Sequence, residues 1–336
     1  MAAILLALFI GAVLIYAVGI NPWKAYRFLV YGAFGSPNSI AETIVKSCPL
    51  VLAGLGFAFA FRCGLFNIGA EGQLYLGALA SILVGIYLKG LPAILHAPIA
   101  VIAAALAGGI WGAIPGYLKA RFGISEIINT IMMNYIGIYF VSYLVHGPLR
   151  EPPGYYPQTA RIADTAAFPK LIEGTRLHAG VFVALLAAFL VYHILKNTTL
   201  GYQIKAVGYN REAARFGGIN VSASFVVTMA ISGALAGLAG ANEMLGVQHR
   251  LLDGFSPGYG YDAIAVALLG RAHPAGVFLA ALLFGSLRAG ANMMQRSAAV
   301  PVQLIYIIQG LVVLFVIGST FLMDRYAARA MKRRVA

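Results

Sequence analysis

Long apolar stretches alternate with short polar breaks along almost the whole chain. About nine of these stretches approach the roughly 20 residues that a helix needs to cross about 30 Å of hydrocarbon. They cover residues 1–20, 48–62, 74–89, 97–118, 127–146, 179–196, 222–241, 274–290 and 303–323, with residues 259–271 as a shorter tenth candidate. The runs are continuous rather than alternating, which indicates helices and not the strands of a barrel. The pattern therefore predicts an all-α polytopic membrane protein with about nine to ten transmembrane segments, some of them broken or re-entrant.

Composition supports this class. The chain has 336 residues, of which 60% are hydrophobic and 10% are charged. Its 39 glycines suit close helix packing and helix breaks within a bilayer. We expect one transmembrane domain over residues 1–324 and a basic tail over 325–336. The first apolar stretch has no basic residues before it, so we expect a retained span rather than a cleaved signal peptide.

The charge of the chain, +13, follows from basic residues at the ends of the apolar stretches. Cytoplasmic loops of membrane proteins retain Lys and Arg, so this charge does not indicate nucleic-acid binding. The tail 325–336 carries five basic residues and is predicted to be cytoplasmic. The basic residues of segment 197–220 place it inside as well, and counting crossings from there towards the N-terminus places the proline-rich segment 147–178 outside. An even number of crossings must then separate 197–220 from the tail, so either 259–271 crosses or two segments form a re-entrant pair.

A weak internal repeat relates residues 110–137 to residues 283–310. Each copy has a glycine-spaced helix end, a polar turn and a following apolar stretch. The crossing count orients the two copies in opposite directions. This relation predicts an inverted repeat, as found in many transporters.

Motifs for catalysis are absent from the sequence. No lysine follows a glycine, which excludes a GxxxxGK[ST] phosphate loop, and GxSxG does not occur. The six histidines and the two cysteines have no metal-binding spacing. We therefore expect a transport protein that is not an enzyme and that binds no metal or cofactor itself.

A glycine-rich break, FRCGLFNIGAEGQLYLGA (residues 61–78), carries Asn67, Glu71 and Gln73 between two apolar stretches. The stretch before it, Pro49–Phe61, spans only about 20 Å as a helix, so we expect the break to lie at membrane depth. Backbone groups freed at such a depth need protein or a polar cavity as partners. Three roles remain open for Glu71: it caps and fixes the break, it contacts substrate, or it couples an ion.

Further polar residues within apolar stretches extend this candidate path. Polar groups in spans usually face the bundle interior, although each could equally form a single interhelical hydrogen bond. Glu126 and Asn129 are three residues apart and can share a helix face. The phenylalanines at 57, 59, 61 and 66 could stack on a flat ring or pack against helices and lipid. We expect the substrate path to include Phe66, Asn67, Glu71, Gln73, Asn129, Asn134, Asn242 and Glu243.

Segment 197–220 contains a short, charged helix between two apolar stretches. Asn210 can cap a helix that begins at REAARF, Glu212 lies in its first turn, and Gly217 and Gly218 can end it. A helix that projects from the membrane surface in this way could dock another protein. An ordinary basic cytoplasmic loop is the alternative.

The stretch GYQIKAVGYNREAARFGGINV (residues 201–221) resembles the cytoplasmic coupling segment of permeases in the branched-chain amino-acid and ribose class of ABC importers. Residues 41–73 (AETIVKSCPLVLAGLGFAFAFRCGLFNIGAEGQ) resemble the nucleoside branch of that class, whose members work with a basic-membrane-protein-type lipoprotein. Residues 263–285 (AIAVALLGRAHPAGVFLAALLFG) are similar to the same branch.

This resemblance implies a permease subunit of an importer of nucleosides, purine nucleosides above all, in a prokaryotic cell membrane. It implies three partners: a second, related permease, a tandem-domain ABC ATPase that uses the ATP, and an extracytoplasmic substrate-binding lipoprotein. A monosaccharide permease of the same class remains an alternative, and so does an ion-coupled secondary transporter that uses Glu71, Glu126 or Glu243. The residues implied in coupling to the ATPase are Gly201, Lys205, Ala206, Val207, Gly208, Asn210, Glu212, Ala213, Ala214, Gly217 and Gly218.

Overall fold

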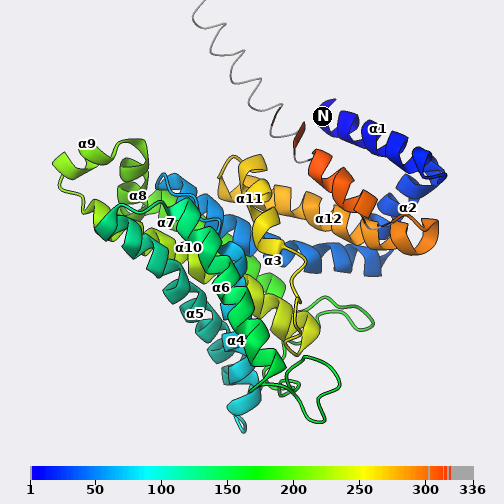
Figure 1. Ribbon diagram of the computed structural model, residues 1–336, viewed down its shortest axis with the longest axis horizontal. Coiled ribbons are helices and arrows are strands. Elements are labelled where there is room, and N and C mark those ends of the chain that lie inside the picture. The colour runs from blue at the N-terminus through cyan, green and yellow to red at the C-terminus, as the bar shows by residue number, and fades with distance from the viewer. Residues whose placement is uncertain (1, 302, 313, 316–317, 319–336) are drawn as a thin grey trace, which may run out of the picture. The chain divides into compact units, whose positions relative to one another are not determined.

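The computed structural model describes residues 2–301, 303–312, 314–315 and 318, and helices dominate this part of the chain (Figure 1). The helices are α1 (Ala2–Ala17), α2 (Pro22–Phe34), α3 (Pro37–Arg62), α4 (Ala70–Tyr87), α5 (Ala93–Phe122), α6 (Glu126–His146), α7 (Gly180–Asn197), α8 (Thr199–Tyr209), α9 (Arg211–Phe216), α10 (Val221–Glu243), the π-helix η1 (Met244–Gln248), α11 (Tyr259–Leu269) and α12 (Pro274–Ala298). Extended pairing in the described residues is limited to two isolated bridges, between Gln158 and Leu252 and between Lys170 and His178.

Within the described residues, seven helices are long and apolar enough to cross a membrane: α3, α4, α5, α6, α7, α12, and α10 continued by η1. Three shorter apolar helices cover Leu5–Ala17, Tyr259–Leu269 and Gln303–Val312. The all-α polytopic class is therefore confirmed. Part of the predicted span 303–323 and the whole tail 325–336 lie outside the described residues.

The first half of α3 corrects one prediction. The helix begins at Pro37 rather than at residue 48 and has 26 residues, which corresponds to about 39 Å. Polar residues such as Glu42 and Lys46 lower the hydropathy of its first turns, so the apolar pattern does not include them. The length of about 20 Å, from which the break was predicted to lie at membrane depth, is therefore wrong, although a break does follow α3.

Helices α2 and α8 were also missed by the pattern. Asn21 caps α2 by accepting hydrogen bonds from the backbone N–H groups of Trp23 and Lys24, and Pro22 occupies the first helical position. Thr198 caps α8 in the same way, through the N–H of Gly201. Segment 197–220 thus contains two helices, not the single one expected.

The chain forms two compact units: unit 2 comprises Ile44–Leu282, and unit 1 comprises the described residues on either side of it. The interior of unit 2 is built from α4, α5 and α10, which touch through glycines. A Cβ added at Gly108 of α5 would lie 2.4 Å from the carbonyl oxygen of Gly233 on α10, and one added at Gly77 of α4 would lie 2.3 Å from the Cα of Gly237. Small residues let these backbones approach closely, which is how membrane helices associate without a hydrophobic driving force between them.

Unit 1 has its own apolar core. It consists of buried side chains from α1, α2, the second half of α12, the following helix and the link between the last two: Ile15, Ala25, Ala291, Met294, Val300, Ile305 and Ile308. The Tyr26 hydroxyl donates to the carbonyl oxygen of Leu8 at 2.5 Å, and Gly290 lies directly against the carbonyl oxygen of Leu29. These contacts join α2 to α1 and α12.

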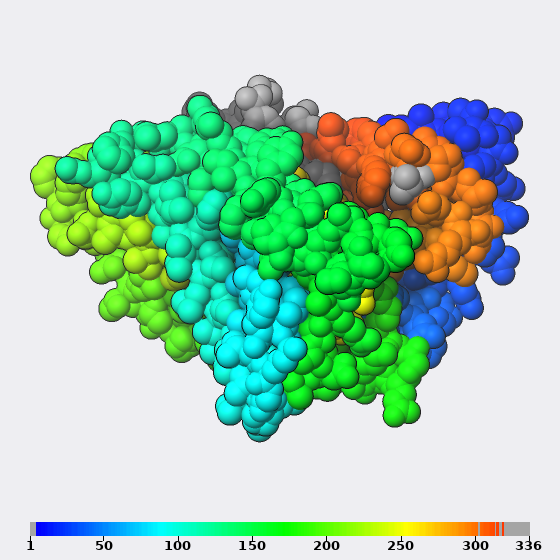
Figure 2. Space-filling model, turned by 60° about the horizontal axis from the view of Figure 1, so that its bottom comes forward, coloured from blue at the N-terminus to red at the C-terminus, as the bar shows by residue number. Residues whose placement is uncertain are grey.

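Segment 147–178 lies over one end of unit 2. The N–H of Ala163 donates to Gly85 at the end of α4, and the N–H of Ile162 donates to His249 just after η1. Figure 2 shows the green region that includes this segment beside the cyan atoms of α4 and the start of α5. Helices α8 and α9 lie at the opposite end of the unit (Figure 1). This separation agrees with the prediction that 147–178 and 197–220 face opposite sides of a membrane.

Candidate functional site

The break between α3 and α4 is held by a pair of amide side chains. Asn67 is fully buried, and its Nδ2 donates to Gln73 Oε1 and to Ser232 Oγ, each at 2.8 Å. Gln73 Nε2 donates back to Asn67 Oδ1, which also accepts from the N–H of Gly69. Ser232 Oγ donates to the carbonyl oxygen of Gly56. The amides therefore tie the break to α3 and to α10, and they use their hydrogen-bonding atoms within the chain.

Asn134 of α6 supplies the second support of the break. Its Oδ1 accepts from the N–H of Gly72, and its Nδ2 donates to the carbonyl oxygen of Ile68, both at 2.7 Å. A helix start leaves backbone N–H groups without intrahelical partners, and this side chain provides one. A Cβ at Gly72 would lie 2.8 Å from the Cα of Asn134, so the close approach of α4 and α6 requires glycine there.

Glu71 points to the start of α11. Its Oε2 accepts from the N–H of Gly260 at 2.6 Å, and the residue is 2% exposed. A Cβ at Gly260 would lie 2.3 Å from the Glu71 backbone nitrogen, so the two helix starts touch directly. The carboxylate lies in the first turn of α4, where the helix dipole favours negative charge. This geometry favours the first of the three roles left open for Glu71, a brace of the break.

Glu126 forms an ion pair at the start of α6. Its Oε2 lies 2.5 Å from Nζ of Lys119, and its Oε1 accepts a long hydrogen bond of 3.5 Å from the N–H of Phe66. The expected neighbour, Asn129, does not join this pair. Its Nδ2 is buried and has no hydrogen-bond partner among the described residues.

Phe66 belongs to a cluster of aromatic rings. Its ring lies 5.3 Å from that of Phe61 and 6.0 Å from that of Phe57, edge-on in both cases. Phe57 is fully buried, whereas Phe61 and Phe66 are partly exposed. These rings pack on one another, and a contact with a flat substrate ring stays a prediction.

Asn242 and Glu243 lie elsewhere, at the far end of α10. Asn242 Nδ2 donates to the carbonyl oxygen of Gly180, and Glu243 Oε1 accepts from Gln248 Nε2. Ten residues of helix separate Asn242 from Ser232, or about 15 Å. The eight predicted path residues thus fall into separate groups, with Asn67, Glu71, Gln73 and Asn134 meeting around the break.

His178 and His249 form a polar cluster beside this far end of α10. His178 is fully buried, accepts from the N–H of Gly180 through Nδ1, and stacks on Phe168. Burial lowers the pKa of His178 to about 4, and the nearby His249 and Arg176 act in the same direction. Burial lowers the pKa of His249 as well. Segment 147–178 therefore packs against η1, and its His178 imidazole is neutral.

Helices α8 and α9 form a projecting tip (Thr199–Phe216). Asn210 separates them, and its Oδ1 accepts from the N–H groups of Glu212 and Ala213, so the predicted cap is confirmed. Gly218 follows with a φ of +80° and turns the chain back, as predicted. Ala214 is buried within the chain, whereas Ala213 is exposed.

Gly208 has a different role from the one expected. It lies inside α8 rather than in a turn, and a Cβ there would lie 2.1 Å from the carbonyl oxygen of Arg62. The tip is therefore attached directly to the chain just before the break. This contact connects the two segments that the sequence singled out.

Two residues of the tip were missed. Tyr209 is 86% exposed and Phe216 is 91% exposed, and they flank α9 at its two ends. Large aromatic side chains of this kind are typical centres of protein interfaces. The sequence could have indicated them, because Tyr209 and Phe216 are large aromatic residues on either side of a short charged helix.

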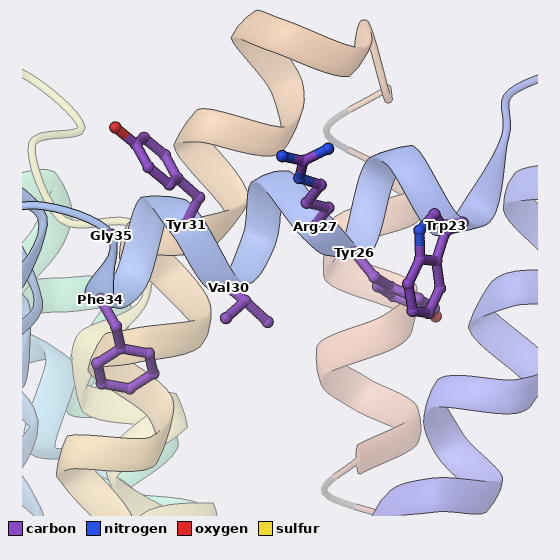
Figure 3. Close-up of a pocket in the computed structure, with 7 residues that line it drawn as sticks. All are labelled: Trp23, Tyr26, Arg27, Val30, Tyr31, Phe34 and Gly35. Carbon is purple, nitrogen blue, oxygen red and sulfur yellow. The ribbon is translucent and has the colours of Figure 1, made fainter.

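A further cavity follows α2. It has a volume of about 500 Å³ and is lined by Trp23, Tyr26, Arg27, Val30, Tyr31, Phe34 and Gly35. Val30 and Phe34 project from the same side of the helix (Figure 3). Trp and Tyr next to basic residues are typical of a helix at the membrane interface. None of the predicted path residues lines this cavity.

Comparisons with known proteins extend the picture. A family model for the permease component of branched-chain amino acid transport systems matches residues 39–317. The chain is 42% identical to the guanosine ABC transporter permease protein of Bacillus subtilis, over 94% of this chain and 92% of that protein. It is 38% identical to the glucose ABC transporter permease protein of Haloferax volcanii, over 98% and 90%. It is 35% identical to the nucleoside ABC transporter permease protein of Lactococcus lactis, over 94% and 88%.

Proposed function

The chain belongs to the family of permease components of branched-chain amino acid transport systems, and we propose that it carries nucleosides, purine nucleosides above all, through an ABC importer. The family makes it a multi-pass transport component of the plasma membrane that works with an ATPase and a substrate-binding partner. The substrate is inferred from two relatives named for guanosine and for nucleosides. The glucose relative supports a monosaccharide as the second candidate, because a ribose-like ring is common to both substrates.

The observation that carries the proposal is the tip formed by α8 and α9. It presents Tyr209, Ala213 and Phe216 to the surroundings, and Gly208 seats it on the carbonyl oxygen of Arg62. In the proposed mechanism the ATPase binds the tip. Closure of the ATPase then moves the tip together with the end of α3, which leads into the break. The break then changes the relative positions of α4, α6, α10 and α11, which its side chains join. Such a movement would switch the path between outward-facing and inward-facing states.

The finer assignment of partners completes the proposal. A second, related permease faces this chain, a tandem-domain ATPase supplies the ATP hydrolysis, and an extracytoplasmic lipoprotein delivers the substrate at the end covered by segment 147–178. This chain itself binds no cofactor. The tip and the C-terminus are on the cytoplasmic side. A reporter inserted near Asn210 should therefore read as cytoplasmic, whereas one near Pro157 should read as external.

Transport by the complete complex tests the substrate. The chain is expressed with its ATPase and lipoprotein in a strain without nucleoside uptake, and uptake of labelled guanosine is measured against excess unlabelled ribose or glucose. We expect guanosine uptake that neither sugar reduces and that an ATPase unable to hydrolyse ATP abolishes. Uptake of glucose alone would establish the second candidate. Guanosine uptake that survives with the inactive ATPase but needs a proton or sodium gradient would establish a secondary transporter.

A further inference from the structure

Two adjoining cavities of unit 2 lie between α7 and the start of α12. The first has a volume of about 300 Å³ and is lined by Arg62, Tyr192, Leu195, Lys196, Lys205, His273 and Pro274. The second has a volume of about 400 Å³ and is lined by Leu185, Ala188, Phe189, Tyr192, Pro274, Ala275, Phe278 and Leu279. Both cavities share Tyr192 and Pro274. The two cavities therefore adjoin at these residues, and we call the pair the groove, which has a polar end and an apolar end.

The polar end has the chemistry of an anion site. Arg62, Lys196 and Lys205 supply three cationic side chains, His273 adds an imidazole ring, and no carboxylate is among the lining residues. Helix α12 begins at Pro274, so the positive end of its dipole faces the same cavity. An anion with several oxygens, such as a phosphate, matches this set of donors.

Contacts within the chain hold these basic groups in place. Lys196 Nζ donates to the Tyr192 hydroxyl at 2.8 Å, and the Tyr192 ring lies edge-on to His273 at 6.2 Å. Arg62 Nε donates to the carbonyl oxygen of Ala272 at 3.0 Å. Ala272 and its predecessor Arg271 both have left-handed backbone angles, with φ of 49° and 53°. Residues held in such conformations cost free energy and cluster at functional sites.

The apolar end has the chemistry of lipid contact. Its walls are the aliphatic and aromatic side chains of two helices that are long enough to cross a membrane. Phe189 is 63% exposed and Leu279 is 67% exposed. A groove that runs along a membrane-spanning helix and ends in a basic cavity at the helix terminus has the polarity of one phospholipid.

We propose that this groove binds one anionic phospholipid, with the phosphate headgroup in the basic cavity and an acyl chain between α7 and α12. Charge complementarity selects the anionic lipid, because the extra cation of a zwitterionic headgroup would face the basic side chains. In the topology proposed above, the lipid belongs to the cytoplasmic leaflet. The site adjoins the tip through Lys205 of α8 and the break through Arg62.

Lipid binding to the complete, detergent-purified transporter tests the proposal by native mass spectrometry. The probes are phosphatidylglycerol, phosphatidylcholine with the same acyl chains, and glycerol 3-phosphate. We expect at least tenfold tighter binding of phosphatidylglycerol than of either other probe. The double variant Lys196→Gln, His273→Gln should lose at least fivefold in phosphatidylglycerol affinity. Lys89→Gln, a charge removed at the exposed far end of α4, should lose nothing.

A second variant tests the apolar end separately. Ala188→Trp fills the groove while leaving the basic residues intact, and it should weaken binding of both lipids at least fivefold. Equal affinity for the two lipids, or equal effects of the Lys89 and Lys196 variants, would overturn the proposal. Glycerol 3-phosphate binding as tight as phosphatidylglycerol would make this a free-phosphate site. A complex that binds none of the probes would also overturn the proposal. Since binding is measured without transport, a failed nucleoside assay would leave this result intact.

Discussion

The break after α3 and the α8–α9 tip are neighbours in the structure, but they differ in the burial of their side chains. Those of the break are buried and hydrogen-bonded, whereas the large side chains of the tip are exposed. We define the break cluster as Asn67, Glu71, Gln73, Asn134 and Ser232. Its side chains bond to one another and to backbone groups of α3, α4 and α11, and each member is at least 98% buried. The tip leaves Tyr209 and Phe216 almost completely exposed.

This difference separates two kinds of functional residue. The break cluster is complete within the chain, so it fixes a backbone geometry that the membrane alone would not tolerate. The tip is incomplete, because large aromatic side chains in water cost free energy until another surface covers them. Variants of the break should therefore lower stability, whereas variants of the tip should lower coupling at unchanged stability.

The largest effect is expected for Asn134→Leu. The change removes the partners of the Gly72 N–H and the Ile68 carbonyl, and each unsatisfied group costs about 1–3 kcal/mol, so the free energy of unfolding should fall by about 3 kcal/mol. The measurement is denaturant unfolding of the permease in detergent. Asn129→Leu on the same helix is the control, because Asn129 Nδ2 has no partner to lose among the described residues. An equal loss in the free energy of unfolding for the two variants would contradict the view that the break cluster stabilises the fold.

Glu71 provides the next test, with two substitutions. Glu71→Gln keeps an oxygen that can accept from the N–H of Gly260, whereas Glu71→Ala does not. A brace predicts near-normal uptake for Glu71→Gln and uptake reduced at least fivefold for Glu71→Ala, with the complex still assembled. Loss of uptake in both variants would show that the charge itself is needed, for substrate or for an ion.

Segment 147–178 packs on the rest of the chain through the buried His178. We therefore expect the free energy of unfolding to depend on pH. The unfolded chain protonates His178 near pH 6.5, whereas the folded chain does so only at about pH 4. The unfolded state thus binds more protons between these values, so stability falls as the pH drops from about 6.5 to about 4. The full loss is on the order of 3 kcal/mol for this one residue.

Thermal unfolding of the permease between pH 7.5 and pH 5 measures this dependence. His178→Phe keeps the stacking on Phe168 and should flatten the pH profile. His146→Phe, at an exposed histidine, should leave the profile of the native chain unchanged. A profile as steep in His178→Phe as in the native chain would contradict the assignment.

The smallest effect on stability is expected within the tip itself. Glu212 and Arg215 form an exposed ion pair at 3.8 Å, and such pairs contribute about 0.3–0.5 kcal/mol on a helix. Glu212→Gln should therefore leave the unfolding transition within about 0.5 kcal/mol of the native chain. A drop of several kcal/mol would mean that the tip is integrated into the fold rather than prepared for a partner.

Local signals explain which parts of this fold could be predicted from sequence. The cap at Asn210 and the turn at Gly218 depend on neighbouring residues alone, and both are confirmed. Helix α3 was predicted to begin too late and α2 was missed, because their polar and aromatic residues interrupt the apolar pattern. One of the two side chains that accept from Asn67, that of Ser232, lies 165 residues away in the sequence. No periodicity in a single sequence shows such a pair.

The same limit applies to the candidate site. Polarity within an apolar stretch identified Asn67, Gln73 and Asn134 as important, and the structure brings them together. Polarity could not separate a side chain that braces a break from one that contacts a substrate, because that depends on which atoms already have partners. Whether these residues also line the substrate path remains a prediction.

The central claim is that the ATPase docks on the tip, and ATP hydrolysis by the reconstituted transporter tests it most directly. Phe216→Ala removes an exposed aromatic anchor, and the loss of one interface hot spot costs about 2 kcal/mol or more. Stimulation of ATP hydrolysis by the substrate-loaded binding protein should fall at least tenfold, while the unfolding transition of the permease stays unchanged. Trp23→Ala, which removes an exposed aromatic side chain from α2, outside both the tip and segment 147–178, should keep native stimulation of hydrolysis. Native stimulation in the Phe216→Ala, Ala213→Glu double variant would show that the ATPase engages the permease elsewhere.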